Sequence, residues 1–220
     1  MPTMSWWEAC LNHSGPNGVS HDMSVRTVAR LWGWIFLTYA ALYSAWGAFD
    51  YVTGPVEFYD FTFRAKYLAH LGTVWTHGVA SVLALALGPF QFVSWLPQRA
   101  HRMLGWGYFA CLFLGGLSGL AMGLWAYGGP VAQAGFVALA LGWLLTSSMA
   151  CYTILKRRFH DHRAWAIRSY ALTFSAVNIR LALYWLEYLE LPFEVIYPWT
   201  AWGAWLITLG LAEWLLVRRK

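Results

Sequence analysis

The sequence predicts an all-α protein, an integral membrane bundle of six transmembrane helices. Hydrophobic residues make up 59% of the 220 residues and charged residues only 11%, which is less than half of the roughly 25% that is usual in soluble domains. Apolar runs of about 20 residues recur along the whole chain, and a helix of that length crosses a hydrocarbon core about 30 Å thick. Together these observations exclude a water-soluble globular protein.

The chain begins with a polar segment, residues 1–27, in which a Gly-Pro-Asn-Gly sequence predicts a turn. We expect this segment to be cytoplasmic or interfacial. It is not expected to be a cleavable signal peptide, because the apolar run after it is too long and no small-residue cleavage motif follows that run. The six-helix domain is expected over residues 28–220. Its spans are predicted at about residues 28–49, 67–95, 103–127, 131–155, 164–186 and 195–217.

The distribution of basic residues predicts the orientation of the spans. The connections that share one side of the membrane carry most of these residues, namely Arg26, Arg30, Arg99, Arg102, Lys156, Arg157, Arg158, Arg163, Arg218, Arg219 and Lys220. The opposite connections are mainly acidic. The positive-inside rule therefore predicts that both termini are cytoplasmic. This rule also accounts for the net charge of +5, so no nucleic-acid partner is expected.

Two residue types have structural explanations. Tryptophan is abundant, with 16 residues, and several lie near predicted span ends, where they are typical interfacial anchors. These include Trp95, Trp125, Trp185 and Trp199. The three cysteines have no metal-binding spacing, and two of them lie in or at the end of apolar runs, so a disulfide framework is not expected.

Ionisable residues inside the spans are the candidates for function, because each is costly in a membrane. In the second span, helical periodicity places His70, His77 and Gln91 on one face. In the third, His101 at the start is followed on its side by several glycines. Gly115 and Gly119 there form a small-xxx-small element, whose ordinary role is helix packing.

The fifth span has the most polar face. His162 and Arg180 lie about five helical turns apart on it, with Thr173 between them. Arg168 is about a third of a turn away, and Asn178 points to the opposite side. For Arg180 two structural alternatives stay open. The side chain could snorkel to the headgroups, or it could form a salt bridge with Glu187. In the sixth span, Glu213 is expected to pair locally with Arg218.

These residues form two predicted layers, and spans two, three and five would enclose both. The outer layer holds His70, His77, Asn178 and Arg180, and the inner layer holds His101, Arg102, His162 and Arg168.

The inner layer suggests a haem b site. Two histidines on different helices can hold a haem iron while arginines neutralise the propionates. His101 and His162 are the candidate ligands, with Arg102 and Arg168 as propionate partners. Another possibility is a zinc or copper site, in which the run His160-Asp161-His162, as a loop, approaches His101.

The alternatives are different in class. The chain could be a cofactor-free membrane enzyme or carrier for a lipid, quinone or isoprenoid, in which His77 titrates and Arg180 binds an anionic group. The candidate substrate-binding residues are then Gln91, Tyr170, Thr173 and Asn178. An accessory subunit or assembly factor of a membrane complex would need only the bundle. The sequence contains no nucleotide-binding loop, nucleophile elbow or zinc-protease helix.

Two stretches resemble a bacterial family of predicted membrane proteins known as domain of unknown function twenty-three-oh-six. One runs from His77-Gly78 through Gly88-Pro89-Phe90-Gln91-Phe92 to Arg99-Ala100-His101-Arg102 and Ser118-Gly119-Leu120. The other runs from His162-Arg163-Ala164-Trp165 through Arg168-Ser169-Tyr170 to Arg180. The likeness covers about residues 68–216.

The resemblance implies a multi-span bundle in a bacterial inner membrane and no settled activity. The positions that match the family's motifs are His77, Gln91, Arg99, His101, Arg102, His162, Arg168, Tyr170 and Arg180. Asn178 and Ala166 depart from its pattern. A likeness to six-helix cytochrome b reductases rests on span count and histidines alone.

The most specific hypothesis that these residues support is a haem b protein that exchanges electrons with a membrane redox partner.

Overall fold

The computed structural model describes residues 25–54, 61–93 and 95–218, and this part of the chain is helical, without strands. Most of the predicted leader and the acidic residues Glu57 and Asp60 lie outside the described residues. The chain divides into a unit that ends at Ile35 and a second unit from Phe36 onward. In the first unit, the described residues form the beginning of a helix with exposed apolar side chains such as Trp32.

The helices follow the predicted spans in order. They are α2 (Val25–Thr53), α3 (Phe61–Ala69), α4 (Leu71–Leu87), the 3₁₀ helix η2 (Gly88–Phe92), α5 (Gln98–Leu124), α6 (Gly129–Leu155), α7 (Phe159–Tyr188) and α8 (Phe193–Val217). Four of these segments are long and apolar enough to cross a membrane, namely Leu71–Phe92, α5, α6 and α8. The prediction of a helical membrane protein is confirmed. The predicted count of six spans is not confirmed. α2 and α7 lie where the other two spans were predicted, but they are less apolar than these four segments.

The second predicted span is not one straight helix. His70 has non-helical dihedral angles, φ −128° and ψ 33°, and separates α3 from α4. At the other end of α4, Pro89 lies in the first turn of η2. Proline has no backbone N–H and fixes φ, so it is compatible with this tight turn but not with a continued α-helix. The chain then turns back through Pro97 into α5.

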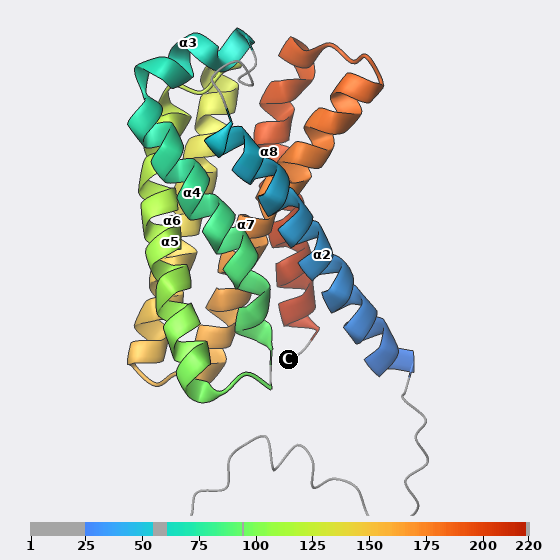
Figure 1. The fold of residues 1–220 in the computed structure, drawn as a ribbon. Helices are drawn as coiled ribbons and strands as arrows, with labels where there is room; N and C mark the ends of the chain where they lie inside the picture. The colour runs from blue at the N-terminus through green and yellow to red at the C-terminus, as the bar shows by residue number, and fades with distance from the viewer. Residues whose placement is uncertain (1–24, 55–60, 94, 219–220) are drawn as a thin grey trace, which may run out of the picture. The chain divides into compact units, whose positions relative to one another are not determined.

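Four helices of the second unit form a ring. Neighbours along the chain pack against each other from α4 to α7, and α4 also contacts α7, while α8 packs against both α6 and α7 (Figure 1). The connections between these helices are short, so neighbouring helices run antiparallel. The part of α2 in this unit joins through Ala41 and Ala45, which pack with Leu85 and Val177.

Glycines allow close packing within the ring, as the small-xxx-small element predicts. A Cβ atom at Gly115 would lie 3.1 Å from the Trp143 ring, and one at Gly116 would collide with Leu144. These contacts join α5 to α6. Because lipid tails are as apolar as the side chains, such packing contributes much of the association between membrane helices. The outward faces of the helices carry large exposed apolar side chains, including the predicted anchors Trp95, Trp185 and Trp199.

The ends of α5 and α8 meet through polar contacts. Tyr127 follows α5, and its hydroxyl donates a hydrogen bond to Glu194 at the start of α8, at 3.3 Å. Partial desolvation and the Glu194 carboxylate both raise the pKa of Tyr127. Nearby, Lys66 donates to the Trp125 carbonyl at 3.0 Å.

Replacing Gly135 by alanine should destabilise the bundle. The new Cβ would lie 3.0 Å from backbone atoms of Ala201 on α8, which cannot rotate away, and overpacking of this kind costs about 1–3 kcal/mol. The matched control is Gly210→Ala, where a Cβ has open space and alanine gains up to about 1 kcal/mol in helix propensity. Thermal unfolding in detergent should rank Gly135→Ala below the wild type and Gly210→Ala at or above it. The opposite ranking would contradict this packing.

Candidate functional site

A hydrogen-bonded cluster occupies the middle of the α4–α7 ring, and the hydroxyl of Thr173 is its centre. Trp143 Nε1 on α6 donates to Thr173 Oγ1 at 2.9 Å, and the Tyr108 hydroxyl on α5 lies 3.1 Å from the same oxygen. Thr173 in turn donates to the carbonyl of Ser169, one turn earlier on α7. All four side chains are buried. The cluster therefore joins three helices through groups that lipid could not satisfy.

The serines beside this cluster extend it towards the end of the bundle where α5 and α7 begin. Ser147 on α6 lies 3.1 Å from Ser169 and donates to the Trp143 carbonyl at 2.6 Å. Each hydroxyl in this group has a partner. The group is thus a satisfied structural network, which fixes the relative height of α5, α6 and α7.

His77 lies inside the ring, as predicted. Its Nδ1–H donates to the Gly115 carbonyl at 2.9 Å, and Nε2 lies 3.4 Å from Ser81 Oγ. Gly119 makes room for the imidazole of His77, because a Cβ at this position would lie 2.9 Å from it. His77 is therefore held by α5 through its backbone.

His70 does not share this environment, so the prediction that it lies on one face with His77 is wrong. Its exposed ring stacks on Trp125, with centroids 4.8 Å apart and an interplanar angle of 20°. The cause is the helix break at His70 itself, which changes the direction of the side chain relative to the periodicity of α4.

The structure brings His101 and His162 together at one end of the ring. Each is the fourth residue of its helix, α5 or α7, and both helices begin at this end (Figure 1). His162 Nδ1–H donates to the Ala150 carbonyl on α6 at 2.8 Å. This bond fixes the tautomer of His162 and leaves Nε2 with a free lone pair.

The run that includes His162 is helical, which removes the premise of the proposed three-ligand metal site. Residues 159–188 form α7, so His160 and His162 point to different sides, and the His160 side chain is 89% exposed. His160 lies 3.7 Å from Asp161. Across the described ranges, no three His, Cys, Asp or Glu side chains converge on a common metal position.

Arg168 is engaged elsewhere, which corrects its predicted role as a propionate partner. Its guanidinium makes two hydrogen bonds to Glu213 on α8, at 2.5 and 2.8 Å, and lies over the Trp165 ring. Glu213 is thus paired with Arg168, and Arg218 lies 3.8 Å over the Trp214 ring. Arg168 and Glu213 thus connect α7 to α8. Arg102, the other predicted partner, is exposed at the same end as the histidines.

Arg180 contacts α2 and its own helix. Its Nη1 donates to Ser44 Oγ at 3.3 Å and to the Ala176 carbonyl at 3.1 Å. No described carboxylate lies within ion-pair distance of it, so the alternative of a salt bridge to Glu187 is not found. The guanidinium is close enough to His77 to interact with its charge.

Asn178 is a connector between helices. Its amide donates to the Ala204 carbonyl on α8 at 3.0 Å. This position agrees with the expectation that Asn178 points away from the Arg180 face, and it gives the side chain a packing role.

Gln91 and Tyr170 differ from the other predicted site residues because each has a buried polar atom without a hydrogen-bond partner. These atoms are Gln91 Nε2 and the Tyr170 hydroxyl. Tyr170 is only 5% exposed. More than 90% of buried polar groups in proteins are paired, so these two atoms mark a place where the interior is incomplete.

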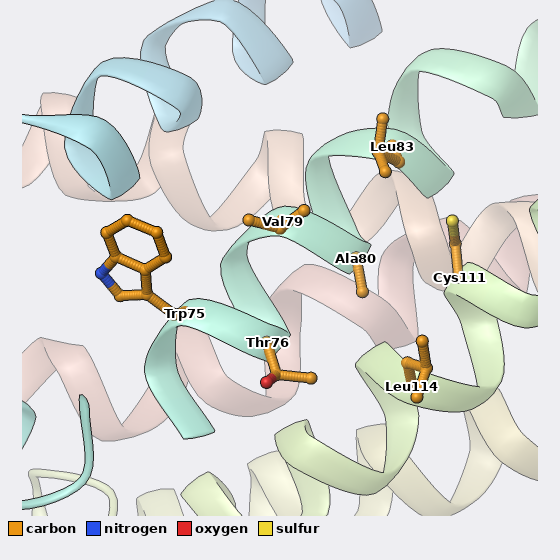
Figure 2. Close-up of a pocket in the computed structure, with 7 residues that line it drawn as sticks. All are labelled: Trp75, Thr76, Val79, Ala80, Leu83, Cys111 and Leu114. Carbon is orange, nitrogen blue, oxygen red and sulfur yellow. The ribbon is translucent and has the colours of Figure 1, made fainter. Parts of the chain in front are cut away.

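A separate open groove of about 320 Å³ lies between α4 and α5 (Figure 2). Its walls are apolar, and the hydroxyl of Thr76 is used by its own helix in a bond to Gly72. Binding sites normally add a few convergent polar groups that orient the ligand. This groove offers none beyond Cys111, so the candidate site is the polar interior.

Comparison with known proteins places the chain in a family. The family model described as "Predicted membrane protein (DUF2306)" matches residues 74–216, which include His77, His101, His162 and Arg180. The chain belongs to this family. No curated protein and no solved structure matches the chain. The resemblance expected from the sequence motifs is confirmed, and the family description names a membrane protein without an activity.

Sequence reasoning missed three residues of the site in this DUF2306 protein. Trp143 and Ser147 lie on α6, a helix that contains no ionisable side chain at this depth, and Ser44 lies on α2. The i, i+4 spacing of Trp143 and Ser147 places them on one face. That spacing could have identified an inward polar stripe, but a search restricted to charged and imidazole side chains could not.

Thr173→Val should destabilise the protein more than its change in volume suggests. Valine has the same shape but leaves Tyr108 and Trp143 without their shared acceptor, and an orphaned buried polar group costs about 1–3 kcal/mol. The matched control is Thr76→Val, because Thr76 bonds only to its own helix. Thermal unfolding in detergent should show a clear loss for Thr173→Val only. Equal stability of the two variants would remove Thr173 from the centre of the cluster.

Proposed function

We propose that this protein is a six-span membrane protein that binds one b-type haem through His101 and His162. The observation that carries the proposal is the placement of these two imidazoles at matching positions of α5 and α7, which begin at the same end of the bundle. Helix bundles commonly hold cofactors in their core by side chains from facing helices.

The hydrogen bond of His162 supports a ligand role. A metal-bound histidine generally donates its other ring N–H to a carbonyl or carboxylate, which orients the ring and raises its basicity. The bond from His162 Nδ1 to Ala150 has this form. Nε2 is then the atom that would hold the iron.

The residues one turn further along both helices are small. Gly105 follows His101 by four residues, and Ala166 follows His162 by the same interval. A Cβ at Gly105 would meet only the end of the Gln91 side chain, at 3.3 Å. The exposed Arg102 is available for a propionate, whereas Arg168 is occupied by Glu213.

A haem with two imidazole ligands supplies low-spin, one-electron chemistry. The part of the protein in that chemistry is limited to positioning. The two histidines would hold the iron, and Arg102 would neutralise carboxylate charge at the water-facing end. The Thr173 cluster beyond them would keep α5 and α7 at one height. A membrane redox partner would approach from the exposed basic end.

The six-span arrangement rests on length and charge. α7 has 30 residues, about 45 Å of helix, and it packs along two apolar helices that can span a membrane. The basic residues of the connections before α5 and α7 lie at the histidine end. By the positive-inside rule this end is cytoplasmic, in the inner membrane of a bacterium.

Replacing both histidines by alanine should remove the haem. Protein expressed with ample haem should show a Soret band, a reduced α-band after dithionite and stoichiometric iron, with neither copper nor zinc. The variant His101→Ala/His162→Ala should lose these signals, because no imidazole remains to hold the iron. The matched control is His160→Ala, two residues from His162 on the exposed side of α7.

The spectrum decides the haem proposal directly. A colourless wild-type protein from haem-replete cells contradicts it, and so does an unchanged Soret band in the double variant. Loss of the band in His160→Ala would show that His160 is a ligand in place of His162.

A second candidate function is supported by Arg180, which has no described carboxylate partner and lies near His77. A cation at membrane depth without an acidic partner is suited to an anionic headgroup. The protein would then be a cofactor-free enzyme or carrier for an apolar substrate with an anionic end, with His77 as its titrating group.

Arg180→Ala should lower the amount of anionic phospholipid that copurifies with the protein. The side chain of Arg180→Lys keeps the charge and should retain most of that lipid. Mass spectrometry of the lipids bound to each purified variant measures the difference. Equal amounts in the wild type and Arg180→Ala would exclude an anion-binding role for Arg180.

A further inference from the structure

Two hydrogen-bond donors without partners lie on facing elements inside the bundle. One is Gln91 Nε2 on η2 and the other is the Tyr170 hydroxyl on α7. Leaving such a group unpaired costs about 1–3 kcal/mol. Two of them in one region indicate that something other than this chain supplies the acceptor.

Both donors belong to one small space. Residues three apart in a 3₁₀ helix are eclipsed, so Gly88 and Gln91 share a face of η2. The Tyr170 ring lies directly against Gly88, where any Cβ would overlap it. The Gln91 carboxamide lies against Gly105 on α5. The Tyr170 ring and the Gln91 carboxamide therefore each lie against a glycine, and the two side chains are placed on the same face of η2.

The side chain of Phe92 lies between these groups and the surface of the bundle. Phe92 is 39% exposed, and its ring centroid lies 5.6 Å from that of Tyr170, which in turn contacts Phe174 at 6.3 Å. Phe92 is thus the exposed side chain that packs against the Tyr170 ring. A flat ligand that entered there would lie among aromatic rings, which favour stacking.

The chemistry of the two groups selects the ligand. Both are neutral donors, and a buried anion would need a charged partner to offset its desolvation. A carbonyl oxygen has two lone pairs and can accept from both donors at once. We infer that Gln91 and Tyr170 bind the carbonyl oxygen of a neutral, flat, apolar ligand of the quinone class, which enters from the membrane past Phe92. This inference does not rest on His101 or His162.

Binding can be tested with decylubiquinone and the full chain in detergent, by isothermal titration calorimetry. The wild type should bind saturably, and n-decylbenzene, which has the tail but no carbonyl, should not bind with comparable affinity. Tyr170→Phe keeps the ring and Gln91→Leu keeps the bulk, and each should weaken binding about three- to tenfold, the value of one hydrogen bond. The matched control is Tyr184→Phe, an exposed tyrosine on the same helix.

Stability separates a ligand contact from a structural role. Because the Tyr170 hydroxyl has no partner in the protein, Tyr170→Phe should unfold at or above the temperature of the wild type without ligand. Loss of stability would mean that the hydroxyl has an internal partner, which would overturn the inference. If Gln91→Leu does not fold, Tyr170→Phe still decides the question.

Three other results would overturn the inference. They are no saturable binding to the wild type, equal binding to Tyr170→Phe and equal affinity for n-decylbenzene. The outcome is separable from that of the haem proposal. The variant His101→Ala/His162→Ala should still bind decylubiquinone, and a wild-type protein without a Soret band would leave the quinone measurement unaffected.

Discussion

The interior depends on the hydrogen bonds that the Thr173 hydroxyl accepts. In water, a buried tryptophan N–H or tyrosine O–H that lost its partner could turn to solvent, but in a bilayer it cannot. One oxygen on α7 serves both groups, at 2.9 Å from Trp143 Nε1 and 3.1 Å from the Tyr108 hydroxyl. Three helices are thereby held at one relative height. Sliding α7 by a turn would leave both buried donors without their shared acceptor, and sliding α5 or α6 would strand one of them.

This constraint organises both ends of the ring. Towards the start of α5 and α7 it aligns His101 with His162, and it places Tyr170 opposite the glycine of η2. Towards the other end, the backbone carbonyl of Gly115 holds His77. The candidate groups therefore lie on one helical frame, and glycines of η2 and α5 lie against Tyr170, Gln91 and His77. A polar interior built in this way is satisfied in its middle and incomplete near Gln91.

Much of this architecture follows from periodicity. The positions of the helices, the inward placement of His77 and the packing role of the glycines could be predicted, because each depends on which face of one helix a residue occupies. Pairings between side chains of different helices could not be predicted. Arg168 with Glu213, Asn178 with Ala204 and Arg180 with Ser44 join residues far apart in sequence, and their choice depends on the relative rotation of helices. The break at His70 was missed because no proline marks it and the nearby Gly72 lies inside α4.

The Arg168–Glu213 ion pair has a consequence for how the protein reaches the membrane. In the proposed six-span arrangement α7 is synthesised first, and it is not apolar enough to qualify as a span by itself, whereas α8 is. A lone arginine in a bilayer is costly, but a paired one is much less so. The carboxylate that neutralises Arg168 is synthesised 45 residues after it. α7 and α8 should therefore partition into the lipid together as a hairpin, with α8 completing the insertion of the helix that carries the candidate ligand.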